Sequence, residues 1–177
     1  MNGNCHFMFG TSIGAMLTLN LDKINDNLIL YSDVETGKWI ASTIILGSII
    51  GSIFPDIDNP KSNMGQLSKP VSTVIGKLGK YAGRTGARHR GIFHDFSIYI
   101  LLLIGSYLYF PYALGFIIGC LSHVFLDMFN PMGVPSVFTR KIIHLGSMTS
   151  DSKEAKVFSA MCSIMTLVVG FIIKYYN

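Results

Sequence analysis

Residues 96–127, FSIYILLLIGSYLYFPYALGFIIGCLSHVFLD, contain two long apolar runs that are separated only by Pro111. We predict a tight helical hairpin over 96–110 and 112–127, because one bent helix of this length would overshoot a hydrocarbon core of about 30 Å. Half of the 177 residues are hydrophobic and 14% are charged, well below the ~25% usual in soluble domains. A membrane protein is therefore expected.

Three more apolar segments extend this pattern to five helices. They cover residues 5–21, 39–54 and 157–173, and Trp39 suits a membrane interface. The start of the chain lacks a basic region, so we predict no cleavable signal peptide. A chain of this length suits one domain. The sequence thus predicts an all-α integral membrane helical bundle of about five spans, with residues 1–177 as a single domain.

The loops differ in charge, and this difference orients the predicted bundle. Residues 55–95 and 128–156 carry most of the Lys and Arg, whereas residues 22–38 are net acidic. The positive-inside rule therefore places both basic loops and the N-terminus in the cytoplasm, with the C-terminus outside. Within the first basic loop, residues 70–81 are predicted to form a short basic amphipathic helix on the membrane surface.

In this topology, histidines and aspartates from four separate segments meet at the cytoplasmic face. Ionisable side chains beside apolar segments are costly to desolvate, so partners are expected for them. We interpret the set as one composite site. Its members are His6, Asp56, Asp58, His89, His94, His123 and Asp127.

Two of the clusters also have simpler interpretations. Asp56 and Asp58 lie in a proline-flanked turn that could direct both carboxylates at a cation, or that could form an acidic Asx-turn. His123 and Asp127 share one helix face at i, i+4 spacing. They are either two ligands of one metal or a hydrogen-bonded pair that holds the bundle together.

The cluster around Arg90 needs a turn to act as a site. His89 and His94 are about 140° apart on a straight helix, so their convergence requires a turn at Gly91. Arg90 is suited to holding a phosphate or a carboxylate. The alternative is a group of interfacial residues that face lipid headgroups.

Imidazole and carboxylate donors together match divalent zinc, with manganese or iron as alternatives and one or more ions. Two nearby ions could activate a water and stabilise a leaving oxygen. The isolated residues Cys5, Cys120 and Cys162 predict neither a disulfide framework nor a zinc-thiolate site. His144 has no acidic neighbour and is interpreted as a loop residue.

The motifs follow one another in a characteristic order. The order is His6, Pro55-Asp56-Ile57-Asp58, His89-Arg90-Gly91-x-x-His94, and His123-x-x-x-Asp127 followed by Gly133-Val134-Pro135. It resembles that of the YdjM/YbcI-like family, bacterial inner-membrane proteins described as metal-dependent hydrolases. The resemblance covers residues 5–145, approximately, and implies metal-site positions at Asp56, Asp58, His89, His94, His123 and Asp127. His6 matches a histidine near the family's N-terminus.

The predicted function is that of an enzyme, a metal-dependent hydrolase in the bacterial inner membrane with its site facing the cytoplasm. The His-x-x-x-Asp spacing is also similar to that of zinc-dependent phospholipase C and zinc nucleases, which implies phosphoester cleavage. A lipid or lipid-linked phosphate is the expected substrate, because the site would lie at headgroup depth. His94 is expected to be a further ligand or a general acid/base, and Arg90 to hold the substrate phosphate. Membrane lipids are the expected partners, and no nucleic-acid partner is predicted.

Three other functions remain open at this point. The first is a non-catalytic regulatory or binding protein with a structural metal, which would need a closed, fully protein-ligated site. The second is a metal or proton transporter with His123 and Asp127 as a relay. The third is a soluble all-helical hydrolase whose apolar runs are core helices.

Overall fold

Most of the chain is helical in the computed structural model, which describes residues 2–28, 30, 32–59, 61–71, 73–74, 92–139 and 141–176. The α-helices are α1 (Gly3–Leu19), α2 (Leu21–Leu28), α3 (Val34–Gly51), α4 (Asn63–Leu67), α6 (Phe96–Tyr109), α7 (Leu114–Asp127) and α8 (Lys153–Tyr176). Short 3₁₀ helices are η1 (Phe54–Asp58), η2 (Ile92–His94) and η3 (Pro111–Ala113). Strand β1 (Val134–Ser136) pairs antiparallel with β2 (Lys141–Ile143), with Val134 opposite Ile143.

The predicted helical hairpin is confirmed. Helix α6 ends at Tyr109, the single turn η3 begins at Pro111, and α7 starts directly after it. Proline fixes its own φ and lacks an N–H, so it begins a new helical turn more readily than it continues an old one. The two helices pack against each other through Tyr99, Ile117 and Cys120 in a shared apolar cluster.

Two predictions about the loops are wrong. Residues 22–38 contain most of helix α2, which was not predicted because this segment has many charged residues. It forms because Leu21, which is buried, packs with Ile40 and Ile44 of α3. Residues 128–156 contain the β1–β2 hairpin, so the fold is not strictly all-α.

Other boundaries move by a few residues. Helix α3 starts earlier than predicted because the Asp33 side chain accepts a hydrogen bond from the Thr36 N–H at 2.9 Å and caps the helix. In the segment predicted as an amphipathic helix, residues 70, 71, 73 and 74 are helical. Residue 72 and residues 75–81 lie outside the described part.

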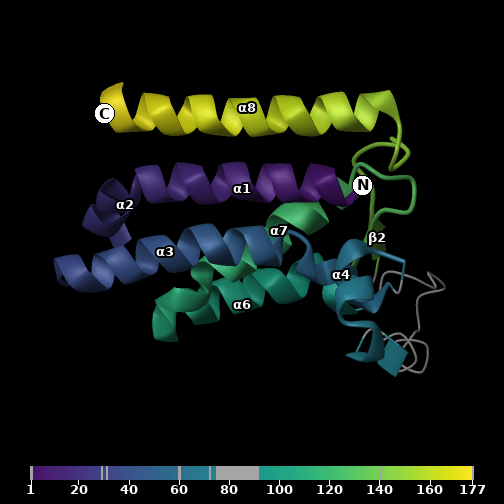
Figure 1. Ribbon diagram of the computed structural model, residues 1–177, viewed down its shortest axis with the longest axis horizontal. Helices are drawn as coiled ribbons and strands as arrows, with labels where there is room; N and C mark the ends of the chain where they lie inside the picture. Colours follow the sequence, from purple (N-terminus) through teal and green to yellow (C-terminus); the bar gives the residue numbers. More distant parts are fainter. Residues whose placement is uncertain are drawn as a thin grey trace.

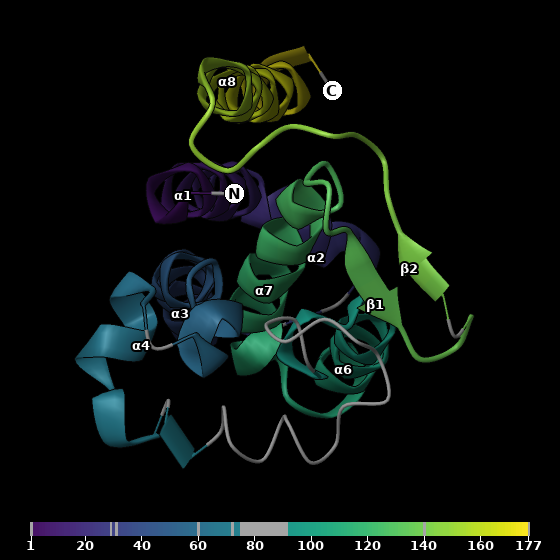
Figure 2. The same cartoon turned by 90° about the vertical axis from the view of Figure 1, so that its right-hand side faces the viewer.

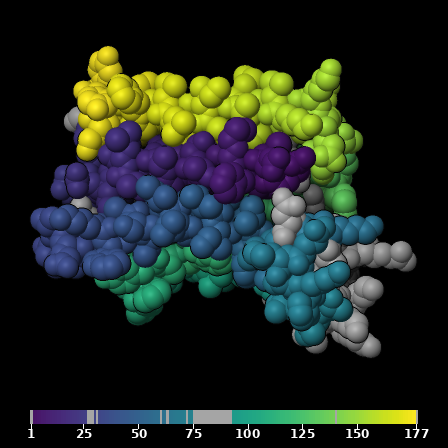
Figure 3. Space-filling model, in the orientation of Figure 1, coloured from purple at the N-terminus to yellow at the C-terminus, as the bar shows by residue number. Residues whose placement is uncertain are grey.

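The long helices lie side by side along the long axis of the molecule, with α8, α1 and α3 forming one broad face (Figures 1 and 3). Helices α1 and α8 run parallel. Near one end Ser159 Oγ donates to the Cys5 carbonyl at 3.0 Å, and near the other Asn20 Nδ2 donates to the Gly170 carbonyl at 2.9 Å. These bonds attach the last helix to the first along their length.

Helices α3 and α7 approach each other almost backbone to backbone. A Cβ added at Gly119 would lie 2.4 Å from the Ser48 carbonyl oxygen, and one at Gly51 would lie 2.1 Å from the Phe116 carbonyl oxygen. Only glycine permits this approach, which is typical of helix packing in membranes. The close contact fixes the position of α7 relative to the end of α3.

Several small polar residues lie inside the bundle beside its apolar core, and many large apolar side chains lie on its exterior. Ser48, Ser122 and Ser159 are buried, whereas Leu46 of α3 and Ile164 of α8 are about 60% exposed. Such an exterior would be costly in water and is suited to lipid. By length and apolar composition, α8 is the one helix in the described residues that could cross a membrane unaided; the apolar helices Phe96–Tyr109 and Pro111–Asp127 are shorter.

Candidate metal centre

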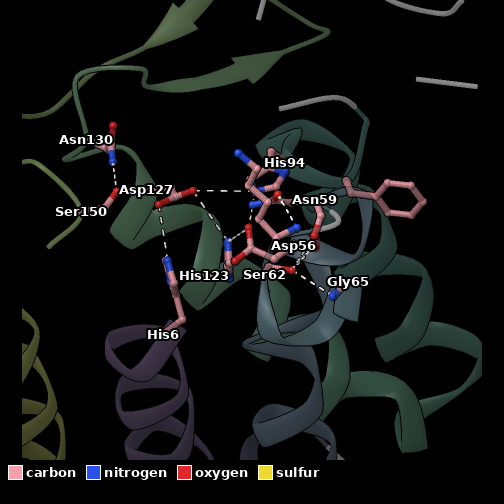
Figure 4. A network of polar contacts seen from close by, with 12 residues as sticks. His6, Asp56, Asn59, Ser62, Gly65, His94, His123, Asp127, Asn130 and Ser150 are labelled. Atoms are coloured by element: carbon pink, nitrogen blue, oxygen red, sulfur yellow. Dashed lines mark hydrogen bonds and ion pairs between the residues drawn. The ribbon is translucent and has the colours of Figure 1, made fainter. Parts of the chain in front are cut away.

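The ends of four helical elements meet at one end of the bundle, which faces the viewer in Figure 2. His6 comes from the first turns of α1, Asp56 from η1 and His94 from η2. His123 and Asp127 come from the last turns of α7. Figure 4 shows these side chains converging on one point. Helix direction explains the meeting, because α1 starts at this end whereas α3 and α7 finish there.

Four donor atoms form the centre of the cluster. His94 Nε2 lies 3.6 Å from Asp56 Oδ1 and 3.7 Å from Asp127 Oδ2. His123 Nε2 lies 3.7 Å from the same two oxygens. These separations are longer than hydrogen bonds. Two imidazoles and two carboxylates therefore face one another without direct bonding.

A backbone carbonyl fixes the orientation of His123. Its Nδ1 lies 2.7 Å from the Ser52 carbonyl oxygen, to which it can only donate a proton. In the neutral ring, Nε2 is then the nitrogen with a free lone pair, and it faces the two carboxylates. A metal-binding histidine is commonly held in this way by a bond at its other nitrogen.

His6 contacts the opposite oxygen of Asp127. Its Nε2 lies 3.4 Å from Asp127 Oδ1, while Oδ2 of the same carboxylate faces His94 and His123. The His6 ring also stacks on that of His123, with centroids 3.7 Å apart and planes 13° apart. His6 thus braces both the carboxylate and the imidazole.

Asp56 is the member of the cluster that is open to solvent. Its side chain is 19% exposed, whereas that of Asp127 is 3% exposed and that of His94 is 1% exposed. Burial alone would raise the pKa of Asp56, but the neighbouring His94 and His123 imidazoles more than offset it and hold that pKa below its ordinary value. Asp56 is therefore an ionised carboxylate at neutral pH.

The donor set fits a divalent ion. Two triads, His6–His123–Asp127 and Asp56–His94–His123, each offer atoms within 4.8 Å of one another. Two ligands of one tetrahedral zinc ion lie about 3.4 Å apart, because metal–ligand distances are about 2.0–2.2 Å. The observed separations of 3.4 to 3.7 Å are close to this value. His and Asp groups that could hold a metal are therefore present.

The structure brings together five of the residues singled out in the sequence: His6, Asp56, His94, His123 and Asp127. Asp58 belongs to neither triad, although it lies in the same 3₁₀ turn as Asp56. His89 and Arg90 lie outside the described residues, so their roles stay predictions. The contact of the Ser52 carbonyl with His123 could not be predicted from the sequence, because every residue type carries a backbone carbonyl.

A polar hollow of about 650 Å³ adjoins the donors. Asp56 and Asp127 line it, together with a wall after η1 and a facing wall before α8. The lining includes Asn59, Lys61 and Ser62 after η1, Thr149 and Asp151 before α8, and Asn2 at the start of α1. The hollow could not be predicted from sequence spacing, because its lining comes from four separate segments of the chain. It gives water and a polar ligand access to Asp56.

Asp95 anchors the chain directly after His94. Its Oδ1 accepts from the Ser97 N–H at 2.8 Å and so caps α6, while its Oδ2 accepts from the Val137 N–H at 2.8 Å and holds the β1–β2 hairpin. The sequence signal for the cap was available, since an aspartate directly before an apolar run is a common helix start. The link to Val137 was not predictable from spacing.

We expect Asp95→Ala to lower the free energy of unfolding by about 2 kcal/mol or more. A lost cap costs about 0.5–2 kcal/mol, and here the Val137 amide also loses its acceptor. Denaturant unfolding in detergent micelles measures the change. Asp33→Ala is the matched control, because it removes an exposed cap that makes no bond to a distant element. Equal losses in the two variants would contradict the anchoring role.

The chain matches the YdjM inner membrane protein family over residues 1–176. It is 34% identical to the inner membrane protein YdjM of Escherichia coli K12, over a 104-residue alignment that covers 52% of this chain and 47% of that protein. The YdjM of Shigella flexneri gives the same values. The chain spans about half the length of these relatives, and no solved structure gives a significant match. The chain therefore belongs to the YdjM family of inner membrane proteins.

Proposed function

We propose that this protein is a membrane-bound, metal-dependent hydrolase that acts on a phosphoester such as a lipid or lipid-linked phosphate. The observation that carries the proposal is the position of the donor set. Four mutually facing imidazole and carboxylate donors lie at the edge of a polar hollow, with Asp56 partly exposed to it. A site of this kind can hold an ion and admit a ligand at the same place.

The proposed membrane arrangement has five crossing helices, α1, α3, α6, α7 and α8, with the site at the cytoplasmic face. The apolar exterior and the alternating helix directions support it. Helices α6 and α7 are short, at about 21 Å each for 14 residues, and a short span is accommodated by local thinning of the bilayer. The described parts of both basic loops lie at the site end, which supports a cytoplasmic orientation.

In the proposed mechanism, His94, His123, Asp56 and Asp127 hold the ion, with zinc first and manganese or iron as alternatives. When bound, a divalent ion supplies Lewis acidity toward a phosphoryl oxygen and acidifies water. His123 Nε2 binds one ion only, so His6 is left to orient Asp127 through its second oxygen. The place of His94 Nε2 between two carboxylates favours a ligand over a general acid/base.

A structural metal in a non-catalytic membrane protein is the second candidate. The observation that favours it is the number of donors, because four protein ligands are enough to close a tetrahedral site. The two candidates differ in one result, which is whether the loaded protein turns over any phosphoester.

Phosphate release provides the test. The protein purified in detergent is assayed for bound metal and then for phosphate release from a panel of phospholipids and polyprenyl phosphates. We expect stoichiometric metal and release that is lost in Asp56→Asn but kept in Asp26→Asn, an exposed change on α2 at the far end of the bundle. Bound metal with no release from any substrate would favour the structural candidate. Absence of metal after gentle purification would refute both.

A further inference from the structure

The walls of the hollow differ in how far their polar groups are already paired. Asn2 Nδ2 donates to Asp151 Oδ1 at 2.9 Å, which attaches the start of α1 to the segment before α8. On the facing wall, Ser62 Oγ donates to the Asp56 carbonyl at 2.7 Å and accepts from the Gly65 N–H. These bonds shape the hollow and occupy the Ser62 hydroxyl and one N–H of the Asn2 amide.

Two cationic or amide donors on the wall after η1 are uncommitted. Among the described residues, the Lys61 ammonium makes no ion pair and the Asn59 side-chain NH₂ makes no hydrogen bond. The Asn59 Oδ1 accepts from the Lys61 N–H at 3.0 Å, which fixes the amide and leaves its NH₂ as a donor. Both residues line the hollow together with Asp56. A positive charge and an oriented amide beside the donor set are suited to an anion with several oxygens.

The opposite wall offers the complementary groups. The Thr149 hydroxyl has no hydrogen-bond partner in the described part of the chain, and Asp151 keeps one carboxylate oxygen beyond its bond to Asn2. Acceptors of this kind bind hydroxyl or amino groups. The hollow is thus lined by uncommitted donors from the segment after η1 and by acceptors from the segment before α8.

An exposed apolar side chain of α1 lies next to the hollow. Gly3 lines the hollow, and Phe7 follows four residues later on the same helix face with 47% of its surface exposed. A ligand with its polar part in the hollow could therefore lay an apolar chain along α1.

We propose that the hollow recognises the phosphate-bearing headgroup of an amphiphile, with Lys61 and Asn59 binding the phosphate and Thr149 and Asp151 binding the hydroxyl or amino part. This inference rests on the proposed function, because it names the substrate class of that site. Lys61 is the specificity-determining residue. It provides the positive charge that offsets the carboxylates Asp56 and Asp127, which would otherwise repel an anion.

Titration with inorganic phosphate tests the anion subsite. Calorimetry on the metal-loaded protein in detergent should give phosphate binding that is about 10–100-fold weaker in Lys61→Met, the range expected for loss of a charge-assisted bond. Lys61→Arg should retain binding. Lys69→Met is the matched control, since Lys69 is also exposed on this segment but does not line the hollow.

A second arm separates a lipid from free phosphate. A short-chain phosphatidic acid should bind more tightly than glycerol 3-phosphate to the parent, and Phe7→Ser should remove this difference without changing the affinity for inorganic phosphate. If the parent bound phosphatidic acid and glycerol 3-phosphate with equal affinity, the amphiphile proposal would be wrong, and a soluble phosphoester would be the better candidate ligand.

Metal content, measured in every sample, distinguishes failure of the Lys61 subsite from failure of the proposed function. If the parent and Lys61→Met hold equal metal and bind phosphate equally, the Lys61 subsite is wrong and the proposed metal site stands. If the parent holds no metal, the proposed function fails, whatever Lys61 does.

Discussion

The Asp127→Ala variant, purified in detergent, is expected to lose stoichiometric metal binding. Asp127 presents one oxygen to His94 and His123 and the other to His6, so its removal takes away the group that every imidazole of the cluster faces. The loss of affinity should exceed the ~10–100-fold that follows removal of an outer-shell partner. Metal analysis after dialysis against a weak chelator measures it.

Histidine variants refine this result. His123→Ala should lose as much metal affinity as Asp127→Ala. His6→Ala should lower the metal affinity by only about 10–100-fold, as expected for a residue that orients a ligand. His144→Ala is the control, because His144 is exposed and belongs to neither triad. If Asp127→Ala keeps full metal occupancy, the proposed centre is wrong. If His6→Ala loses as much as His123→Ala, His6 is itself a ligand.

The Gly119→Ala variant is expected to lose stability and metal affinity together. The new Cβ would lie 2.4 Å from the Ser48 carbonyl oxygen and 2.9 Å from the Ser52 nitrogen, and backbone atoms cannot rotate away. Overpacking of this kind costs about 1–3 kcal/mol. Separation of the helices would also displace the Ser52 carbonyl from His123 Nδ1, which is now 2.7 Å away.

Thermal unfolding in one detergent, paired with metal titration, measures both effects. Gly105→Ala on α6 is the matched control, since no heavy atom of the described chain lies within 4 Å of the added Cβ. That variant should be neutral, or more stable by up to about 1 kcal/mol through helix propensity. A Gly119→Ala protein with unchanged unfolding temperature would refute the close packing of α3 on α7.

The long helices were predictable because an apolar run of sufficient length has few other structures available to it. In residues 96–127, a single proline between two apolar runs predicts a helical hairpin, and the structure has that hairpin. Helix α2 and the β1–β2 hairpin were missed for a different reason. Each depends on a contact with a distant element, such as Leu21 with Ile40, or Val137 with Asp95. The composition of a segment does not show which distant residues it will contact.

The composition of the cluster followed from topology, whereas its internal geometry did not. Successive long helices alternate in direction, and this places His6, near the start of α1, beside Asp127 at the end of α7. The division of the Asp127 oxygens between two sides, and the Ser52 carbonyl on His123, depend on how closely α3 packs on α7. That distance is set by glycines whose role in packing is recognised only once their neighbours are known.

The order of synthesis gives the cluster a further consequence. His6 lies in α1 and Asp127 at the end of α7, with α3 and α6 between them, so the donor set closes a long loop of the chain. Every member of the set precedes α8 in the sequence. We therefore expect that the proposed ion site can assemble before α8 is synthesised. Attachment of α8 along α1, through Asn20 and Ser159, would then follow assembly of the cluster.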